Sequence, residues 1–177
     1  PPDEGTVFLD GENITDVFTD KNGNVSLFDT QGRLIRQINN QATKSYITVS
    51  YVNSTSLRID KITDGVGRVY DFAYNQNDLL DSIQYLGSNN VVHATVKFGY
   101  STSGDLLTIT DTDDKKCYYT YNSDHVLLTA KDIDDYKLQY TYYEPIAPTD
   151  TNAPRWQPYR VKQIAAFDGT AAGGTVA

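Results

Sequence analysis

Apolar and polar residues alternate along short stretches of the chain, and Gly, Asn and Asp interrupt these stretches about every eight to twelve positions. No stretch keeps the spacing of an amphipathic helix over three turns. Strict alternation is typical of strands with one covered face, and frequent turn residues are typical of antiparallel hairpins. The sequence therefore predicts an all-β fold made of short, consecutive antiparallel strands.

The alternation recurs as a triplet of apolar residues, two positions apart, that ends in a tyrosine. The triplets are Ile47/Val49/Tyr51, Tyr70/Phe72/Tyr74, Val96/Phe98/Tyr100, Cys117/Tyr119/Tyr121 and Leu138/Tyr140/Tyr142. A weaker earlier copy places Val25 and Phe28 in the same role. The closing aromatic residues lie 21 to 26 positions apart, which is typical of a repeat whose units bury their faces against their neighbours. The triplets are therefore expected to form the inward face of a sheet.

A polar turn follows each triplet, and a return strand comes next whose two apolar residues lie three positions apart. These pairs are Ile35/Ile38, Ile59/Ile62, Leu80/Ile83, Leu106/Ile109 and Leu127/Ala130. Alternation alone would place the two residues on opposite faces. Either both faces are partly covered, or a β-bulge restores the shared face. We favour the bulge, which would also make the repeat sheet curved and twisted.

Four regions follow from these patterns. Residues 1–24 are expected to form lead-in strands or a cap, and residues 25–143 an array of about five hairpin units. Residues 144–158 are rich in proline and form a loop, and residues 159–177 contain a truncated further repeat and a mobile tail. Because the chain does not begin with Met, we expect either an internal piece of a longer protein or removal of a signal peptide.

Composition excludes several classes of partner. The net charge is −8 and no basic run occurs, which argues against nucleic acid or an anionic membrane surface. No apolar run reaches the about 18 residues that would span a bilayer. Cys117 is the only cysteine, so an internal disulfide is excluded and either a reducing cytosol or a Gram-positive exterior would fit.

The repeated units resemble the YD repeats, also called RHS repeats. The resemblance rests on "FDTQGRLIRQIN", "YDFAYNQNDLLDSI", "FGYSTSGDLLTITDTDD" and "YTYNSDHVLLTAKD", and it covers about two-thirds of the chain. The usual form is a Y-x-Y-D/N segment, a turn with Gly, and a G-R-L-x-x-I/V-x-D segment. Departures are Asn75 and Asn122 in place of the family's Asp, and the absence of the turn glycine from "NQND" and "NSDH".

In that family, which includes bacterial Rhs and wall-associated proteins, toxin-complex shell components and teneurins, the repeats form a sheet that spirals into a shell. The shell surrounds a C-terminal toxin or peptide. The resemblance implies a non-catalytic shell segment, with the rest of the parent polypeptide and a C-terminal effector as partners. The lead-in "TDKNGNVSLFDTQGRL" is similar to secreted or wall-associated proteins of Gram-positive bacteria, which implies an extracellular location. The family's self-cleaving core motif is not visible, so no catalytic residue is carried over.

The residues themselves suggest no enzyme and no cofactor. His93 and His125 lie in different units and are expected to be surface histidines, and Cys117 is expected to be a small core residue. Two acidic stretches could hold a cation but are expected to be turns instead. Their candidate ligands are Asp20, Asn22 and Asn24, and Asp111 and Asp113.

Aromatic residues outside the inward face support an alternative function. These residues are Tyr46, Tyr85, Tyr118, Tyr136, Tyr143 and Trp156. If Trp156, Tyr118 and Tyr136 converged on the outer surface, the chain could be a cell-surface module that binds a glycan or a protein. An array that ends in open strands could also pair edge to edge with a second copy.

Overall fold

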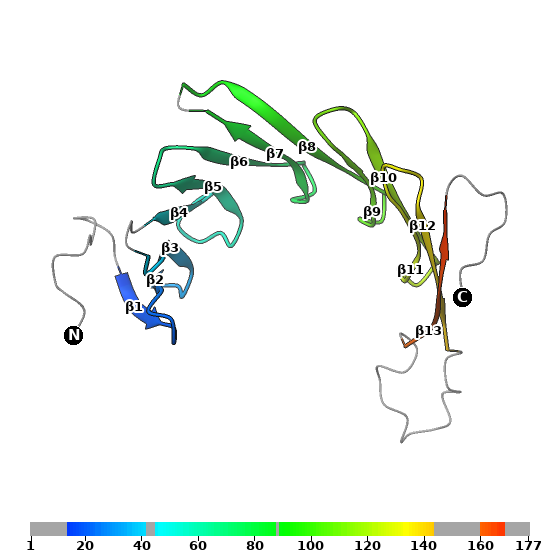
Figure 1. Ribbon diagram of the computed structural model, residues 1–177, viewed down its shortest axis with the longest axis horizontal. Helices are drawn as coiled ribbons and strands as arrows, with labels where there is room; N and C mark the ends of the chain where they lie inside the picture. Colours follow the sequence, from blue (N-terminus) through cyan, green and yellow to red (C-terminus); the bar gives the residue numbers. More distant parts are fainter. Residues whose placement is uncertain (1–13, 42–44, 88, 144–159, 169–177) are drawn as a thin grey trace, which may run out of the picture. The chain divides into compact units, whose positions relative to one another are not determined.

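The computed structural model of the chain describes residues 14–41, 45–87, 89–143 and 160–168. These residues form thirteen antiparallel strands in one open sheet, and the order of the strands in the sheet is their order along the chain (Figure 1). The described residues contain no helix, and thus no helix long and apolar enough to cross a membrane. The predicted all-β class of consecutive antiparallel hairpins is confirmed.

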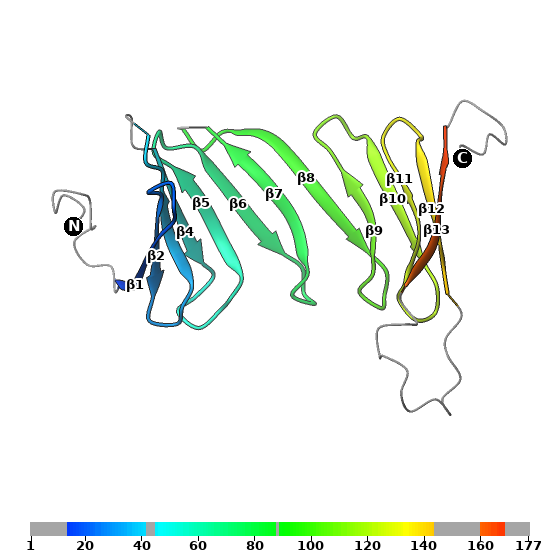
Figure 2. The same ribbon diagram turned by 60° about the horizontal axis from the view of Figure 1, so that its bottom comes forward.

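The sheet divides into two units. The N-terminal unit comprises Pro1–Tyr74 and Ile83–Thr95, and the C-terminal unit comprises Asn75–Ser82 and Val96–Ala177. Strands of the N-terminal unit are β1 (Ile14–Thr19), β2 (Val25–Asp29), β3 (Leu34–Ile38), β4 (Tyr46–Tyr51), β5 (Ile59–Asp64) and β6 (Val69–Tyr74). Strands β7 (Leu80–Leu86) and β8 (Val92–Tyr100) contribute residues to both units. Strands of the C-terminal unit are β9 (Leu106–Thr110), β10 (Lys116–Tyr121), β11 (Leu127–Lys131), β12 (Lys137–Tyr142) and β13 (Val161–Phe167). From β1 to β12, the connections between successive strands lie alternately at one end of the strands and at the other (Figure 2).

A shift of register occurs where five of the closing aromatic residues meet their return strands. In the pairing of β4 with β5, Tyr51 lies opposite Ile59 and Ser50 lies opposite Lys61, so that Asp60 is the extra residue. Equivalent shifts occur at Phe28, Tyr100, Tyr121 and Tyr142. The extra residue brings Ile59 and Ile62 opposite Tyr51 and Val49, on one face of the sheet. The predicted β-bulge is therefore confirmed in these hairpins. In the first hairpin, however, Ile35 is itself the extra residue and Ile38 lies on the face of Leu27, so the shared face expected for Ile35 and Ile38 is wrong.

The two faces of the N-terminal unit both contain buried residues. We call the face that carries Val49, Tyr51 and Ile62 the tyrosine face. Val49 is buried on it, whereas Leu27 and Arg36, which lie opposite one another in β2 and β3, are buried on the other face. Burial on a single face was thus too simple an expectation here.

The earliest repeat corrects a detail of the prediction. Phe28 does take the position of a closing aromatic residue, opposite Leu34. Val25 pairs with Ile38, and alternation places it with Leu27 on the opposite face from Phe28. The shared role that the sequence suggested for Val25 and Phe28 is therefore wrong, because an odd spacing of three residues within one strand changes the face.

In the C-terminal unit the triplet residues follow the expected arrangement. Phe98 lies opposite Ile109, and Ile109 lies opposite Cys117. Tyr119 and Leu138 both lie opposite Ala130. These paired side chains share one face. Cys117 is half-buried within this row.

The ends of the described chain also form strands. Strand β1 lies within the region expected to hold lead-in strands and pairs with β2. Strand β13 pairs with β12 as a return strand, and Val161 lies opposite Tyr142. The proline-rich segment 144–158 and the C-terminal tail lie outside the described residues.

Candidate functional site

One turn structure recurs at both ends of the strands. In the first complete example, the Asp29 Oδ1 atom accepts hydrogen bonds from the backbone N–H groups of Gln31 and Arg33, at 3.0 and 2.9 Å. The Gly32 N–H donates to the Asp29 carbonyl, and Gly32 has a φ of 72°. A type I turn followed by a residue in the left-handed region has this pattern. The same side-chain bonds form at Asp20, Asp64, Asn75, Ser101, Asp111, Asn122 and Asp132.

This turn explains why the chain departs from the repeat pattern without losing the hairpin. Asn75 and Asn122 stand in place of aspartate, and each Oδ1 atom still accepts the two backbone bonds. The left-handed position that lacks glycine is occupied by Asp78 at φ 63° and His125 at φ 61°. Asp, Asn and His adopt this region more readily than other residues with a Cβ.

A hydrogen bond from a tyrosine hydroxyl joins successive hairpins. Tyr51, at the end of β4, donates to the carbonyl of Leu34 at 3.0 Å, and Leu34 is the residue opposite Phe28 in the preceding hairpin. Tyr74 donates in the same way to Ile59, opposite Tyr51. Further bonds of this kind run from Tyr100 to Leu80 and from Tyr142 to Leu127, at 2.8 and 2.6 Å. We call this hydrogen bond the tyrosine tie.

Burial keeps these hydroxyl groups in the form that donates. It raises the pKa of Tyr51, Tyr100 and Tyr142 above the ordinary value of 10.0. A phenol must be protonated to donate to a carbonyl, so the ties persist across the neutral range. The closing tyrosines thus combine half-buried rings with a bond that fixes one unit to the unit before it.

Polar and charged side chains reinforce the same junctions. The Arg33 guanidinium donates from Nε to Asp29 Oδ2 at 2.7 Å and from Nη1 to the Ser56 carbonyl at 2.7 Å. Its central carbon lies 4.4 Å from the centre of the Tyr51 ring, a cation–π distance. In the C-terminal unit, His125 Nδ1 lies 2.8 Å from Asp105 Oδ1 and joins two neighbouring turns.

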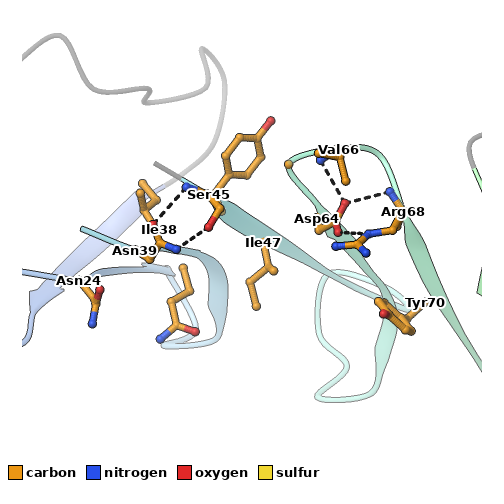
Figure 3. Close-up of a pocket in the computed structure, with 12 residues that line it drawn as sticks. Asn24, Ile38, Asn39, Ser45, Ile47, Asp64, Val66, Arg68 and Tyr70 are labelled. Atoms are coloured by element: carbon orange, nitrogen blue, oxygen red, sulfur yellow. Dashed lines mark hydrogen bonds and ion pairs between the residues drawn. The ribbon is translucent and has the colours of Figure 1, made fainter. Parts of the chain in front are cut away.

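A groove of about 590 Å³ lies at one edge of the N-terminal unit, between the loop after β3 and the turn between β5 and β6. Figure 3 shows Ile47 between two groups of polar residues, Asn39 and Ser45 on one side and Asp64 and Arg68 on the other. Gln37 and Tyr70 also line the groove, and the other lining residues are Asn24, Ile38, Tyr46, Gly65 and Val66.

The Arg68 guanidinium in this groove is engaged differently from that of Arg33. Both belong to a D-x-x-G-R turn, and Arg68 Nε donates to Asp64 Oδ2 at 2.5 Å. The side chain of Arg68 is 55% exposed, whereas that of Arg33 is 11% exposed. Among the described residues, no hydrogen bond engages the Nη atoms of Arg68. Although burial opposes it, bonding to the Arg68 backbone and side chain lowers the pKa of Asp64, so both partners stay ionised.

An aromatic row begins at the groove. The ring of Tyr70 stacks on that of Tyr85 with centroids 5.4 Å apart, and Tyr85 lies 5.6 Å from the ring of His93. Tyr70 lies opposite Ile62 on the tyrosine face, so Tyr85 belongs to that face too. The expectation that Tyr85 points outward is therefore wrong, because Tyr85 stacks on Tyr70 and lies two positions after Ile83 in β7, which places the two on the same face.

The fold of the chain is similar to parts of several solved structures. The chain matches no protein-family model and no curated protein. It is similar to a chain of the TcdB2–TccC3–Cdc42 crystal structure, with a TM-score of 0.58 and 16% identity over 90% of this chain. Similarity extends to the TcdB2–TccC3 structure and to a Tc holotoxin pore of Photorhabdus luminescens, each with a TM-score of 0.56 and 16% identity. The matches cover 88% and 87% of this chain. This chain spans 8 to 9% of the length of those chains.

The fold is RHS-like. At 16% identity the comparison concerns the fold alone, and it agrees with the repeat pattern of the sequence. The residues expected to form the repeat core lie in strands of this sheet and are half-buried. They are Tyr51, Phe72, Tyr74, Phe98, Tyr100, Tyr119, Tyr121, Tyr140 and Tyr142.

The outward aromatic residues proposed for binding are only partly described. Tyr118 and Tyr136 are 44% and 43% exposed. The Lys131 ammonium lies 5.4 Å from the centre of the Tyr118 ring, and Tyr136 follows the turn that begins at Asp132. No ring contact joins the two tyrosines in the described part of the chain, and Trp156 lies outside it.

The residues weighed for cation binding take part in the recurring turns. Asp20 accepts the backbone N–H groups of Asn22 and Asn24, and its second oxygen accepts the Asn24 amide at 2.8 Å. Asp111 accepts the N–H groups of Asp113 and Lys115. Within the described ranges, no group of three His, Cys, Asp or Glu side chains could hold a metal ion.

Proposed function

We propose that the chain is a non-catalytic structural segment of a large exported bacterial protein, in which it forms part of a wall that holds or shields a C-terminal effector. Neighbouring hairpins are joined by backbone pairing and by recurring turns, and a tyrosine tie is added at four of the junctions. This construction extends a sheet by one unit at a time. The similarity to Tc toxin structures supports the same structural role.

The tyrosine tie carries this proposal. A ligand-binding module needs one well-formed surface, whereas this chain repeats the same inter-unit bond at Tyr51, Tyr74, Tyr100 and Tyr142. Repetition of a contact between neighbours is the property that stabilises an array. The remainder of the parent polypeptide is therefore the main partner of the chain.

Deletion of one complete unit tests the proposal in the longer parent protein. Removal of residues 101–121 joins Tyr100 to Asn122, so a closing tyrosine is again followed by its turn. We expect the remaining array to fold and the C-terminal region of the parent to become sensitive to limited proteolysis, because the wall is one hairpin shorter. A Tyr118→Ala variant serves as the control. Unchanged protection of the C-terminal region after the deletion would contradict the proposal.

A further inference from the structure

The ring contact between Tyr70 and Tyr85 departs from the repeat pattern. In the hairpin before it, the corresponding positions hold Ile47 and Asp64, which pair directly across β4 and β5. Correspondence is counted from the closing tyrosine and from the first residue of the return strand. The next two hairpins also have an apolar residue and an aspartate there, which are Val96 and Asp111, and Cys117 and Asp132. Two phenols therefore replace a pair that the repeat otherwise keeps.

The two rings are placed for a reaction between them. Their centroids lie 5.4 Å apart with an interplanar angle of 30°. Tyr70 is 40% exposed and Tyr85 is half-buried. Both phenols also lie near the Arg68 guanidinium, whose pKa is raised by Asp64 and, to a smaller extent, by Tyr85 and Tyr70. The hydroxyl-bearing ends of the two rings thus lie on the same side of the pair. In the described part of the chain, no other two tyrosine rings are in contact.

We propose that Tyr70 and Tyr85 are a site of oxidative cross-linking, at which a dityrosine bond fastens β6 to β7. Two phenoxyl radicals form when a peroxide-driven one-electron oxidant, such as a haem peroxidase, removes one electron and one proton from each tyrosine. The radicals combine through a new C–C bond between one Cε atom of each ring. The hydrogens on these two carbons then move to the phenol oxygens and restore both aromatic rings. The two electrons and two protons that were removed reduce one hydrogen peroxide to two molecules of water.

The sheet favours coupling within one chain over coupling between chains. Because neighbouring strands hold the two rings in contact, the radicals react at a high effective concentration. The exposed part of Tyr70 gives the oxidant access to the pair. The bond closes the chain between Tyr70 and Tyr85 and restricts its unfolded state, as a disulfide does. With Cys117 as its only cysteine, the chain has no internal disulfide that could do this.

Oxidation of the full 177-residue chain by a haem peroxidase and hydrogen peroxide tests this site. Cleavage before aspartate residues releases Tyr70 in the fragment 64–70 and Tyr85 in the fragment 81–104. In the monomeric product, we expect mass spectrometry to find the two fragments joined, with a mass two hydrogen atoms below their sum. Fragmentation should place the bond at Tyr85 rather than at Tyr100. Tyr85→Phe keeps the ring but removes the phenol, and it should lower the yield of joined fragments by about tenfold or more.

Tyr118→Phe is the matched control, because Tyr118 is a strand tyrosine of similar exposure to Tyr70 that lies outside the ring contact. Its yield of joined fragments should equal that of the original chain. The cross-linked monomer should melt about 5 °C or more above the untreated chain, and oxidised Tyr85→Phe should not. The proposal is overturned if the fragments are not joined, if Tyr118→Phe lowers the yield as much as Tyr85→Phe, if most cross-links join separate molecules, or if the melting temperature does not rise.

Discussion

The two units share one hairpin plan but differ in how they hold it. The four buried hydrophobic residues, Leu27, Ile38, Val49 and Leu86, all lie in the N-terminal unit. In the described part of the C-terminal unit, no hydrophobic side chain reaches the same degree of burial. A sheet can therefore continue through its backbone pairing and half-buried aromatic rings after strong side-chain burial has ended.

The turns of the two units also differ, in the residues at their left-handed positions. Glycine occupies three of the left-handed positions in the N-terminal unit, Gly23, Gly32 and Gly67, with Asn90 at another. The C-terminal unit has Gly104 and four residues with a Cβ, which are Asp78, Asp114, His125 and Asp135. The same hairpin thus tolerates residues that adopt this backbone region at some cost in free energy.

The largest expected difference between the units is in the free energy of unfolding that is lost when a leucine side chain is truncated, because the two leucines differ in burial. Leu27 is 2% exposed and Leu107, an extra residue at a bulge, is 37% exposed. We expect Leu27→Ala to lower the free energy of unfolding by about 2–4 kcal/mol, because it leaves a cavity. The matched Leu107→Ala should cost about 0.5 kcal/mol. Urea unfolding of both variants measures the difference, and equal losses would mean that the units do not differ in packing.

Acid should destabilise the N-terminal unit by protonating Asp29 in its turn. Burial opposes ionisation, but bonding to Arg33 and Gln31 outweighs it and lowers the pKa of Asp29 below 3.8. The stabilisation is therefore complete above about pH 4 and is lost as the pH falls through the lowered pKa. Asp29→Asn should cost about 1–2 kcal/mol at pH 7 and progressively less below pH 4.

Unfolding curves from pH 7 to pH 2 measure this dependence. The solvent-exposed Asp113→Asn is the control. A cost of Asp29→Asn that stays constant over the whole pH range would show that the ionised carboxylate contributes nothing to stability.

Each tyrosine tie should contribute about the same free energy of unfolding in both units. Replacement of Tyr51 or Tyr142 with Phe keeps the ring and removes the hydroxyl that donates to Leu34 or Leu127. We expect each variant to lose about 1 kcal/mol, the net value of one hydrogen bond whose acceptor is left in place. Tyr118→Phe should lose almost nothing. If Tyr142→Phe proved neutral, the tie would matter only where burial is strong.

Turn substitutions should give the smallest effects, with opposite signs. A Cβ at Gly67 would meet no atom within 4 Å, so Gly67→Ala tests the left-handed backbone alone, at φ 84°. We expect a loss of about 1 kcal/mol. Asp114→Gly should gain up to about 0.5 kcal/mol, because it relieves the same conformation at φ 60°. Thermal unfolding resolves both, and a stabilised Gly67→Ala would refute the account of the turn.

Much of the fold could be predicted from the sequence because alternation and turn residues are local properties. The spacing of Ile59 and Ile62 was enough to indicate a bulge, which the register confirms. The face of Tyr85 and of Val25 could not be predicted as securely, since it depends on where a bulge falls or on an odd spacing within the strand.

The groove was not predicted at all. Its lining combines residues from several strands with the D-x-x-G-R turn between β5 and β6, and no motif along the chain shows that these segments lie together. The difference in exposure between Arg33 and Arg68 could not be predicted either, because both arginines end the same turn sequence. Arg33 differs because the carbonyl groups of a later loop and the ring of Tyr51 engage its guanidinium. An exposed glutamine beside a D-x-x-G-R turn is a weak signal that could direct a later search.

The tyrosine tie also has a direction. Each hydroxyl reaches back to a carbonyl of an earlier hairpin, so the acceptor is always made before the donor during synthesis on the ribosome. A nascent chain can therefore complete each unit against one that has already emerged, without waiting for downstream sequence. An array built in this way can lengthen during evolution by duplication at its C-terminal end, since every added copy finds its acceptor already in place.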